Sequence, residues 1–213
     1  MVERASLLFR NRRTSEMKIQ FHGTAADPQL NVLHSGVQER AKMSIFNVIA
    51  CDPGVPLTLA LVSASGRLVA IAEKDEVATN FKKNSYHNNA ALIGHKMFKW
   101  TTWSKLPVKA VVELVGPMPT DGVVSACRFT GSYYMFLGIC AGLGIPVEQV
   151  TPAKWKRDLG LKFTAETNLK EASRAMAIKE FPDKIDLFKY KKSHDRAEAG
   201  LLGLWLLKHG GIS

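Results

Sequence analysis

The chain has 213 residues, 46% of them hydrophobic, which is enough for one domain with a buried core and leaves little room for two. Charge or glycine interrupts every apolar run before it reaches transmembrane length, and we see no signal-peptide core near the start. The formal net charge of +10 at pH 7 favours a polyanionic partner, nucleic acid ahead of a membrane surface, over the plainer alternative of a basic protein without such a partner.

The first 42 residues differ from the rest of the chain. They mix RNRRTSEMK with HGTAADPQLN and keep neither a strand period nor a helix period. We predict a disordered or loosely attached extension over residues 1–42 and one folded domain over residues 43–213. A related hypothesis is that Met43 is the true start of the protein.

Five apolar, β-branched runs bounded by turn residues predict five strands. In chain order they are SIFNVIACDPG, LTLALVSASG, RLVAIAE, KAVVELVGP and IPVEQVTP. The second and third runs meet near Gly66, which predicts a β-hairpin.

Helical spacing predicts the segments between and after the later strands. A polar region ending near Trp103 comes first, followed by GVVSACRFTGSYYMFLGICAGLG, PAKWKRDLG, TNLKEASRAMAIKEF and KKSHDRAEAGLLGLWLLKHG. Pro152 suits the first turn of a helix. A β-meander followed by alternating helices and strands implies an α/β fold, in which helices flank a mixed sheet.

Three cysteines, Cys51, Cys127 and Cys140, form no CxxC pair. All three lie inside apolar segments, and an odd, widely spaced set is typical of reduced thiols. We therefore predict three thiols in the protein core and a cytosol-like compartment.

Two acidic residues belong to predicted strands. Asp52 ends the first strand, where Asp before Pro-Gly is also ordinary turn chemistry. Glu113 lies within AVVELV, where a doubly buried strand would require the carboxylate to be paired, metal-bound or protonated. The alternative for Glu113 is an edge strand on which the side chain faces water.

Asp195 and Glu198 lie three residues apart, so they share one face of the last predicted helix. They imitate a capping box, and Ser193 or Asp195 could cap the helix. The helix beyond them, AGLLGLWLL, is apolar nearly all round and predicts a buried helix. Taken together with Asp52 and Glu113, the pair makes four hard oxygen donors, which suit Mg²⁺ or Mn²⁺ better than Zn²⁺.

Four segments resemble, in order, the motifs of RuvC-type Holliday junction resolvases of the kind found in bacteriophages. They are IACDPG, VVELVGPMPTDGVVS, FTGSYYMFLGICAGLGIPVEQVTPAKWKRDLGL and HDRAEAGLLGLW, within about residues 44–208. The resemblance implies a ribonuclease H-like fold, with a mixed five-stranded sheet flanked by helices and the nuclease domain at residues 43–213.

The resemblance also implies that Asp52, Glu113, Asp195 and Glu198 are catalytic and bind two Mg²⁺ ions, or Mn²⁺. Glu198 stands where many family members carry Asp, and either residue can ligate Mg²⁺. His194 is either a catalytic helper or a surface residue before the helix. Cellular members place an aromatic wedge shortly after the strand Glu. Here LVGPMPTDG has no aromatic residue, Met118 and Pro119 are the candidates for a wedge, and a plain loop is the alternative.

Basic residues predict the DNA contacts. Between Glu76 and Glu113 there is no acidic residue, and lysines alternate with aromatic side chains. Such a pattern indicates either a strand-binding surface or a solvated helix with its core side. The residues we predict to contact DNA are Lys82, Lys83, Lys154, Lys156, Arg157, Lys191 and Lys192.

Glycines recur in the long central helix at Gly131, Gly138 and Gly142, with Gly144 after them. Glycine in a helix is unfavourable by about 1 kcal/mol relative to alanine, so close packing is the expected reason. The resemblance implies that this helix forms a homodimer matching the two-fold symmetry of a four-way junction. Packing within one chain is the alternative.

These features predict a Mg²⁺-dependent endonuclease that nicks four-way or branched DNA as a homodimer, in the cytoplasm of a bacterium or phage-infected cell and without a membrane partner. One alternative is a related nuclease acting on flaps or RNA–DNA hybrids, and another is a non-catalytic junction-binding protein. An actin-like sugar kinase is excluded because the chain is too short for two lobes and has no glycine-rich phosphate loop.

Overall fold

A computed structural model of the chain describes residues 45–54, 57–73, 86–116, 122–161 and 168–210. All of them lie within the unit Ala41–Ser213. The extension predicted over residues 1–42 lies outside the described residues. Within the described ranges, no helix is long and apolar enough to cross a membrane.

A mixed five-stranded sheet with the order β3-β2-β1-β4-β5 forms the centre of the fold. The strands are β1 (Asn47–Asp52), β2 (Thr58–Val62), β3 (Leu68–Ala72), β4 (Val108–Glu113) and β5 (Val147–Val150). β2 is antiparallel to both β1 and β3, whereas β4 is parallel to both β1 and β5. The predicted hairpin is confirmed, and its Gly66 has a φ of 81°, which glycine adopts readily.

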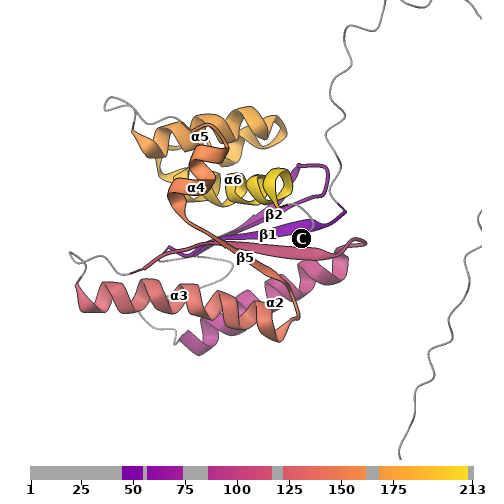
Figure 1. The fold of residues 1–213 in the computed structure, drawn as a ribbon, viewed down its shortest axis with the longest axis vertical. Coiled ribbons are helices and arrows are strands. Elements are labelled where there is room, and N and C mark those ends of the chain that lie inside the picture. Colours follow the sequence, from indigo (N-terminus) through magenta and orange to yellow (C-terminus); the bar gives the residue numbers. More distant parts are fainter. Residues whose placement is uncertain (1–44, 55–56, 74–85, 117–121, 162–167, 211–213) are drawn as a thin grey trace, which may run out of the picture. The chain divides into compact units, whose positions relative to one another are not determined.

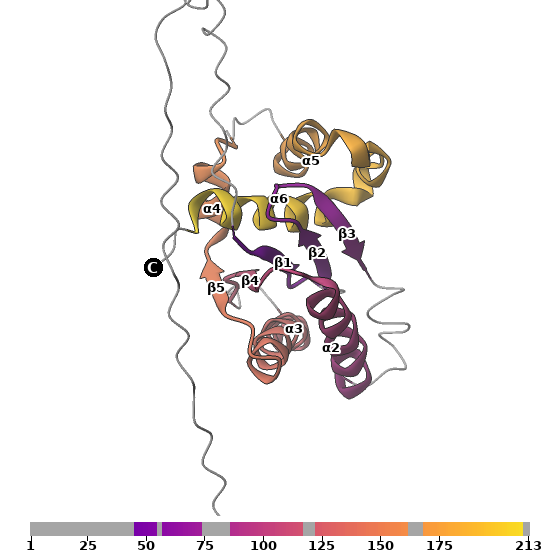
Figure 2. The ribbon, with the colours of Figure 1, turned by 90° about the vertical axis from the view of Figure 1, so that its right-hand side faces the viewer.

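Two layers of helices cover the sheet (Figures 1 and 2). One face carries α2 (Tyr86–Trp103) and α3 (Val123–Gly142), and the other carries α4 (Pro152–Asp158), α5 (Leu169–Glu180) and α6 (His194–His209). The predicted helices are confirmed. Two short 3₁₀ segments, η1 (Pro182–Leu187) and η2 (Lys191–Ser193), were not predicted, because so few residues show no periodicity.

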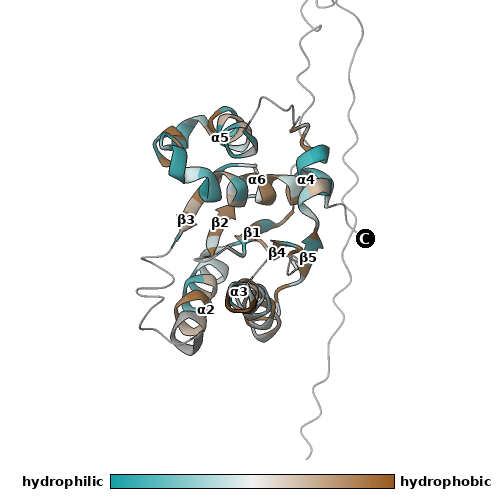
Figure 3. Ribbon diagram, turned by 90° about the vertical axis from the view of Figure 1, so that its left-hand side faces the viewer, coloured by the Kyte–Doolittle hydropathy of each residue, from teal (hydrophilic) through white to brown (hydrophobic). Residues whose placement is uncertain are grey.

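Each face of the sheet has its own apolar core. In β1, Val48 and Ala50 pack into the core under α6, while Ile49 and Cys51 pack into the core under α2 and α3. This alternation explains why β1 reads as a continuous apolar run, since both of its faces are buried. Figure 3 shows the hydrophobic residues of the strands between the two helical layers.

Two glycines let helix α6 pack closely on its neighbours. A Cβ atom on Gly203 would lie 2.7 Å from Val62 Cγ2 in β2, and one on Gly200 would lie 3.1 Å from a ring atom of Phe181 at the end of α5. The glycines of α3 behave differently: no heavy atom of the described residues lies within 4 Å of a Cβ built on Gly138 or Gly142. Close packing within the chain therefore explains the glycines of α6 and not these two glycines of α3.

The cysteine prediction is partly wrong. All three cysteines are free, and Cys51 and Cys140 are buried as predicted. Cys127 is exposed, because it lies near the start of α3, ahead of the part of this helix that is buried, which begins at Ser132. An apolar sequence context did not show where along the helix burial begins.

Candidate active site

Asp52 is the last residue of β1, at the edge of the sheet where β1 and β4 both end. Its Oδ1 accepts a hydrogen bond of 3.2 Å from the backbone N–H of Gly54, so the turn chemistry seen in the sequence is present. Burial raises the pKa of Asp52 to about 8, and the negative charges of Glu113, Asp195 and Glu198 add to that shift. Asp52 is therefore a carboxylate crowded by other carboxylates.

Glu113 ends β4, which pairs with β1 on one side and β5 on the other. The edge-strand alternative is therefore wrong, and so is the mid-strand position, since Glu113 is the final residue of its strand. Its Oε2 accepts a hydrogen bond of 3.0 Å from Trp155 Nε1. Burial raises the pKa of Glu113, and the Trp155 hydrogen bond and the Lys156 charge partly offset this shift.

Asp195 lies in the first turn of α6. Ser193 occupies the N-cap position, yet no side-chain capping hydrogen bond is found there among the described residues. The capping-box alternative is thus not supported. Asp195 Oδ1 lies 2.9 Å from His194 Nε2. Burial raises the pKa of Asp195, against the lowering effect of His194 and Lys170.

Glu198 lies one turn further along α6 and faces two donors. Its Oε1 lies 3.1 Å from Lys156 Nζ and accepts a hydrogen bond of 3.0 Å from Ser173 Oγ. The Lys156 and Glu198 side chains are only 13% and 15% exposed, so this ion pair is largely shielded from water. Salt screens a shielded ion pair less than an exposed one. Lys156 is therefore engaged by Glu198, whereas the sequence predicted that it contacts a DNA phosphate.

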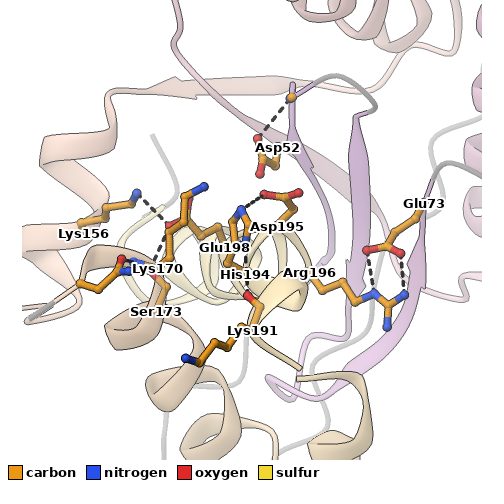
Figure 4. A network of polar contacts seen from close by, with 12 residues as sticks. Asp52, Glu73, Lys156, Lys170, Ser173, Lys191, His194, Asp195, Arg196 and Glu198 are labelled. Carbon is orange, nitrogen blue, oxygen red and sulfur yellow. Dashed lines mark hydrogen bonds and ion pairs between the residues drawn. The ribbon is translucent and has the colours of Figure 1, made fainter. Parts of the chain in front are cut away.

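Figure 4 shows Asp52 above the start of α6, with Asp195 turned toward it and Glu198 turned toward Lys156. The negative charges of the other three carboxylates all help to raise the pKa of Asp52. In this arrangement, however, no three His, Cys, Asp or Glu side chains of the described residues lie close enough together to hold a metal ion. Glu113 and Glu198 are instead engaged by Trp155 and Lys156.

His194 contacts two oxygen atoms. Its Nδ1 lies 3.3 Å from the carbonyl oxygen of Lys191, and its Nε2 faces Asp195. The side chain is 22% exposed, so it is neither a plain surface residue nor a core residue. A catalytic role for His194 stays a prediction.

The basic residues predicted to contact DNA fall into three groups. Lys82 and Lys83 lie outside the described residues, as do Met118 and Pro119 of the expected wedge loop. Lys156 is largely buried against Glu198. The exposed members lie on α4 and η2, close in sequence to the residues that hold the carboxylates: Lys154, Arg157, Lys191 and Lys192.

The aromatic residues of α2 divide between core and surface. Trp100 is 4% exposed and packs under the helix, while Phe98 and Trp103 are 54% and 76% exposed. Helix α2 therefore has a buried side, as expected of a solvated helix that packs on the core. It also exposes two aromatic side chains.

Sequence reasoning missed the residues that hold the carboxylates in place. Trp155 read as a core residue and Lys156 as a phosphate contact, although each also donates to an acid of the site. Ser173 was not identified. The available signal was the WK pair at positions 155 and 156, in the helix that begins at Pro152, which occurs in a segment of the resolvase resemblance.

The order of strands and helices defines a ribonuclease H-like fold, as predicted. Two solved structures of RuvC from Thermus thermophilus share it. RuvC in complex with a Holliday junction substrate is 18% identical with a TM-score of 0.57, and a second RuvC structure is 16% identical with a TM-score of 0.55. Each comparison covers 78% of this chain and 95% of RuvC.

Sequence comparison adds a relative outside bacteria. The chloroplastic Holliday junction resolvase MOC1 of Chlamydomonas reinhardtii is 36% identical over 96 residues, which is 45% of this chain. The match spans 10% of the length of that relative. No protein-family model matches the chain. The resemblance to RuvC-like resolvases is confirmed by a named resolvase and by the RuvC fold.

Proposed function

We propose that this protein is a metal-dependent endonuclease that nicks four-way or branched DNA. The observation that carries the proposal is the gathering of four carboxylates, two from the ends of parallel strands and two from the start of α6, in a ribonuclease H-like fold. The name of the algal relative and the substrate in the RuvC complex both support a junction as the branched DNA.

The donor set fits Mg²⁺ or Mn²⁺. Asp52, Glu113, Asp195 and Glu198 supply only hard oxygen ligands, and a bound cation would oppose the burial and the neighbouring carboxylates that raise the pKa of Asp52 to about 8. When bound, such ions activate water and stabilise the leaving oxygen of a phosphodiester. A pair of Mg²⁺ ions per site is part of the proposal.

The other side chains of the proposed site orient the carboxylates or bind DNA. Trp155 fixes one oxygen of Glu113, and Lys156 and Ser173 share one oxygen of Glu198, which leaves the second oxygen of each carboxylate available. Exposed Lys154, Arg157, Lys191 and Lys192 contact the DNA backbone beside the acids in this proposal.

The proposal includes a homodimer through α3. Val123, Val124 and Tyr134 on this helix are 80%, 63% and 64% exposed, and the contact-free Gly138 would let a second copy approach closely. Analytical ultracentrifugation should find a dimer that Tyr134→Glu converts to a monomer. A wild-type protein that sediments as a monomer at micromolar concentration would remove this part of the proposal.

Residues 43–213 are proposed to carry the nuclease activity, with residues 1–42 as an extension. The compartment is still a prediction, and the chloroplastic relative does not support the bacterial or phage setting in particular.

The test uses the full chain with end-labelled substrates in Mg²⁺ or in EDTA. The substrates are a four-way junction, a flap, an RNA–DNA hybrid and a linear duplex. We expect paired, symmetric nicks in the junction with Mg²⁺ and none in EDTA. Preferential cleavage of the flap or hybrid would assign a different nuclease, and tight junction binding without cleavage would indicate a non-catalytic binding protein.

A further inference from the structure

Arg196 and Glu73 form an ion pair beside the four carboxylates. Arg196 Nε and one terminal nitrogen each donate to a different oxygen of Glu73, both at 2.6 Å. The pair joins the first turn of α6 to the residue directly after β3, 123 positions away in the chain. The hydrogen bonds to Glu73 raise the pKa of Arg196.

Stability alone does not explain the position of this pair. The side chains are 32% and 31% exposed, so the pair is partly buried, and its two-point geometry stabilises the fold by about 1 kcal/mol. The location of Arg196 is also electrostatically unfavourable, because the amino end of a helix disfavours positive charge. Its neighbour in the chain, Asp195, is a carboxylate, yet the guanidinium turns away from it and binds Glu73 (Figure 4).

The first turn of α6 needs contacts of this kind. It lacks a side-chain cap among the described residues, and it follows a 3₁₀ segment rather than a rigid element. Ala197, between the two acids, is fully buried in the core under α6, and the close glycine contacts of the helix follow at Gly200 and Gly203. The direction of Asp195 and Glu198 about the helix axis also depends on the contacts that hold the first turn from the sides.

Figure 4 shows contacts on two sides of this turn. On one side, Glu198 is held by Lys156 and Ser173 from α4 and α5. On the other side, Arg196 is held by Glu73 from the end of β3. Asp195 lies between them, turned toward Asp52.

We propose that the two-point bond between Arg196 and Glu73 is a positioning device, which fixes the first turn of α6 so that Asp195 and Glu198 face Asp52 and Glu113. Arg196 and Glu73 touch neither metal nor DNA in this role. The inference rests on the proposed function, since it concerns the same carboxylates.

The test measures two quantities on full-length variants: Mn²⁺ affinity, from the electron paramagnetic resonance signal of free Mn²⁺, and junction cleavage at saturating protein. For Glu73→Gln we expect about a tenfold loss in both, because residues that orient metal ligands have effects of about 10- to 100-fold. Junction affinity in EDTA and the thermal midpoint should stay close to wild type. Arg196→Lys should lose nearly as much as Glu73→Gln, because an ammonium keeps the charge but cannot make two parallel bonds.

The matched control is Glu180→Gln. Glu180 binds Lys208 at 3.1 Å, its side chain is also 31% exposed, and the pair holds the opposite end of α6. This control should leave both quantities unchanged. Wild-type Mn²⁺ affinity in Glu73→Gln would overturn the positioning role, and wild-type behaviour of Arg196→Lys would reduce the role to charge alone. If the wild type binds Mn²⁺ but does not cleave, the proposed nuclease fails while Mn²⁺ affinity still tests the positioning.

Discussion

The two pairs of carboxylates lie in regions of opposite character. Asp52 and Glu113 end two adjacent parallel strands, where the sheet itself fixes the backbone. Asp195 and Glu198 lie in the first two turns of a helix, where side-chain contacts to Glu73, Lys156 and Ser173 provide restraint. A site can thus combine one half set by backbone hydrogen bonding with another half set by a small number of side chains.

The two pairs of carboxylates also differ in their electrostatic surroundings. Asp52 receives one backbone N–H, while burial and three neighbouring carboxylates raise its pKa. Glu198, by contrast, has a lysine within 3.1 Å. Asp52 therefore retains its proton up to about pH 8 in the metal-free protein, whereas the charge of Glu198 is already partly balanced.

The largest expected effect comes from the strand pair. Asp52→Asn should lower Mg²⁺-dependent junction cleavage by about a thousandfold or more, because it removes a ligand of the proposed metal site while changing the side-chain volume little. Junction binding in EDTA should persist. The control is Asp186→Asn, at a carboxylate that is 92% exposed, pairs with Lys189 and is not one of the four acids, so this variant should cleave like wild type. Full activity of Asp52→Asn would contradict the assignment.

A smaller effect should follow from loss of the hydrogen bond that holds Glu113. Trp155→Phe keeps an aromatic ring but removes the N–H that donates to Glu113 at 3.0 Å, so cleavage should fall about tenfold. Trp205→Phe is the matched control, since Trp205 Nε1 donates at the same 3.0 Å to Asp158, which is outside the four acids. Equal losses in rate for the two variants would show that Glu113 has no special dependence on Trp155.

The next largest effect should come from the close packing of α6 on the sheet, and it should appear in the free energy of unfolding. Gly203→Ala places a Cβ 2.7 Å from Val62 Cγ2, and overpacking of this kind destabilises by about 1–3 kcal/mol. Gly138→Ala in α3 meets no described atom within 4 Å and should be neutral or stabilise by up to about 1 kcal/mol. Urea denaturation measures both. Equal stability of the two variants would remove the distinction between these helices.

The smallest effect is a pH dependence of stability in EDTA. The pKa of Asp52 is raised from 3.8 to about 8, so the folded protein retains a proton that the unfolded chain releases. The contribution of Asp52 to the free energy of unfolding is therefore fully present below pH 3.8 and is lost as pH rises through 8. Asp52→Asn lacks this loss.

The stability advantage of Asp52→Asn over wild type should consequently grow from pH 5 to pH 8, by about 1 kcal/mol once solvent screening is allowed for. Urea midpoints at pH 5, 6.5 and 8 give the comparison. An advantage that shrinks with rising pH would contradict the cause assigned to the raised pKa.

Much of the fold could be predicted from the sequence because its elements have strong local signals. The apolar run ending in Asp52, the hairpin at Gly66 and the apolar helix after Glu198 are each apparent without tertiary information. The 3₁₀ segments are too short for such a signal. The exposure of Cys127 depends on where along α3 burial begins, which is at Ser132, and only the packing of the helix decides that position.

The four acids could be predicted from the sequence because the resemblance supplies their order. Their restraints could not, because each one joins residues far apart in the chain. Lys156 and Glu198 are 42 positions apart, and Arg196 and Glu73 are 123 apart. Trp155 shows the limit well: composition identifies it as a core residue, and only the fold brings its N–H to Glu113.

Whether both regions form one metal-holding centre is tested most directly by Mn²⁺ titration of the wild type, Asp52→Asn and Glu198→Gln, followed by electron paramagnetic resonance. We expect that the wild type binds Mn²⁺ and that either change, on the strand or on the helix, weakens that binding at least tenfold. Wild-type affinity in one variant and a loss only in the other would show that the two regions do not share a metal site.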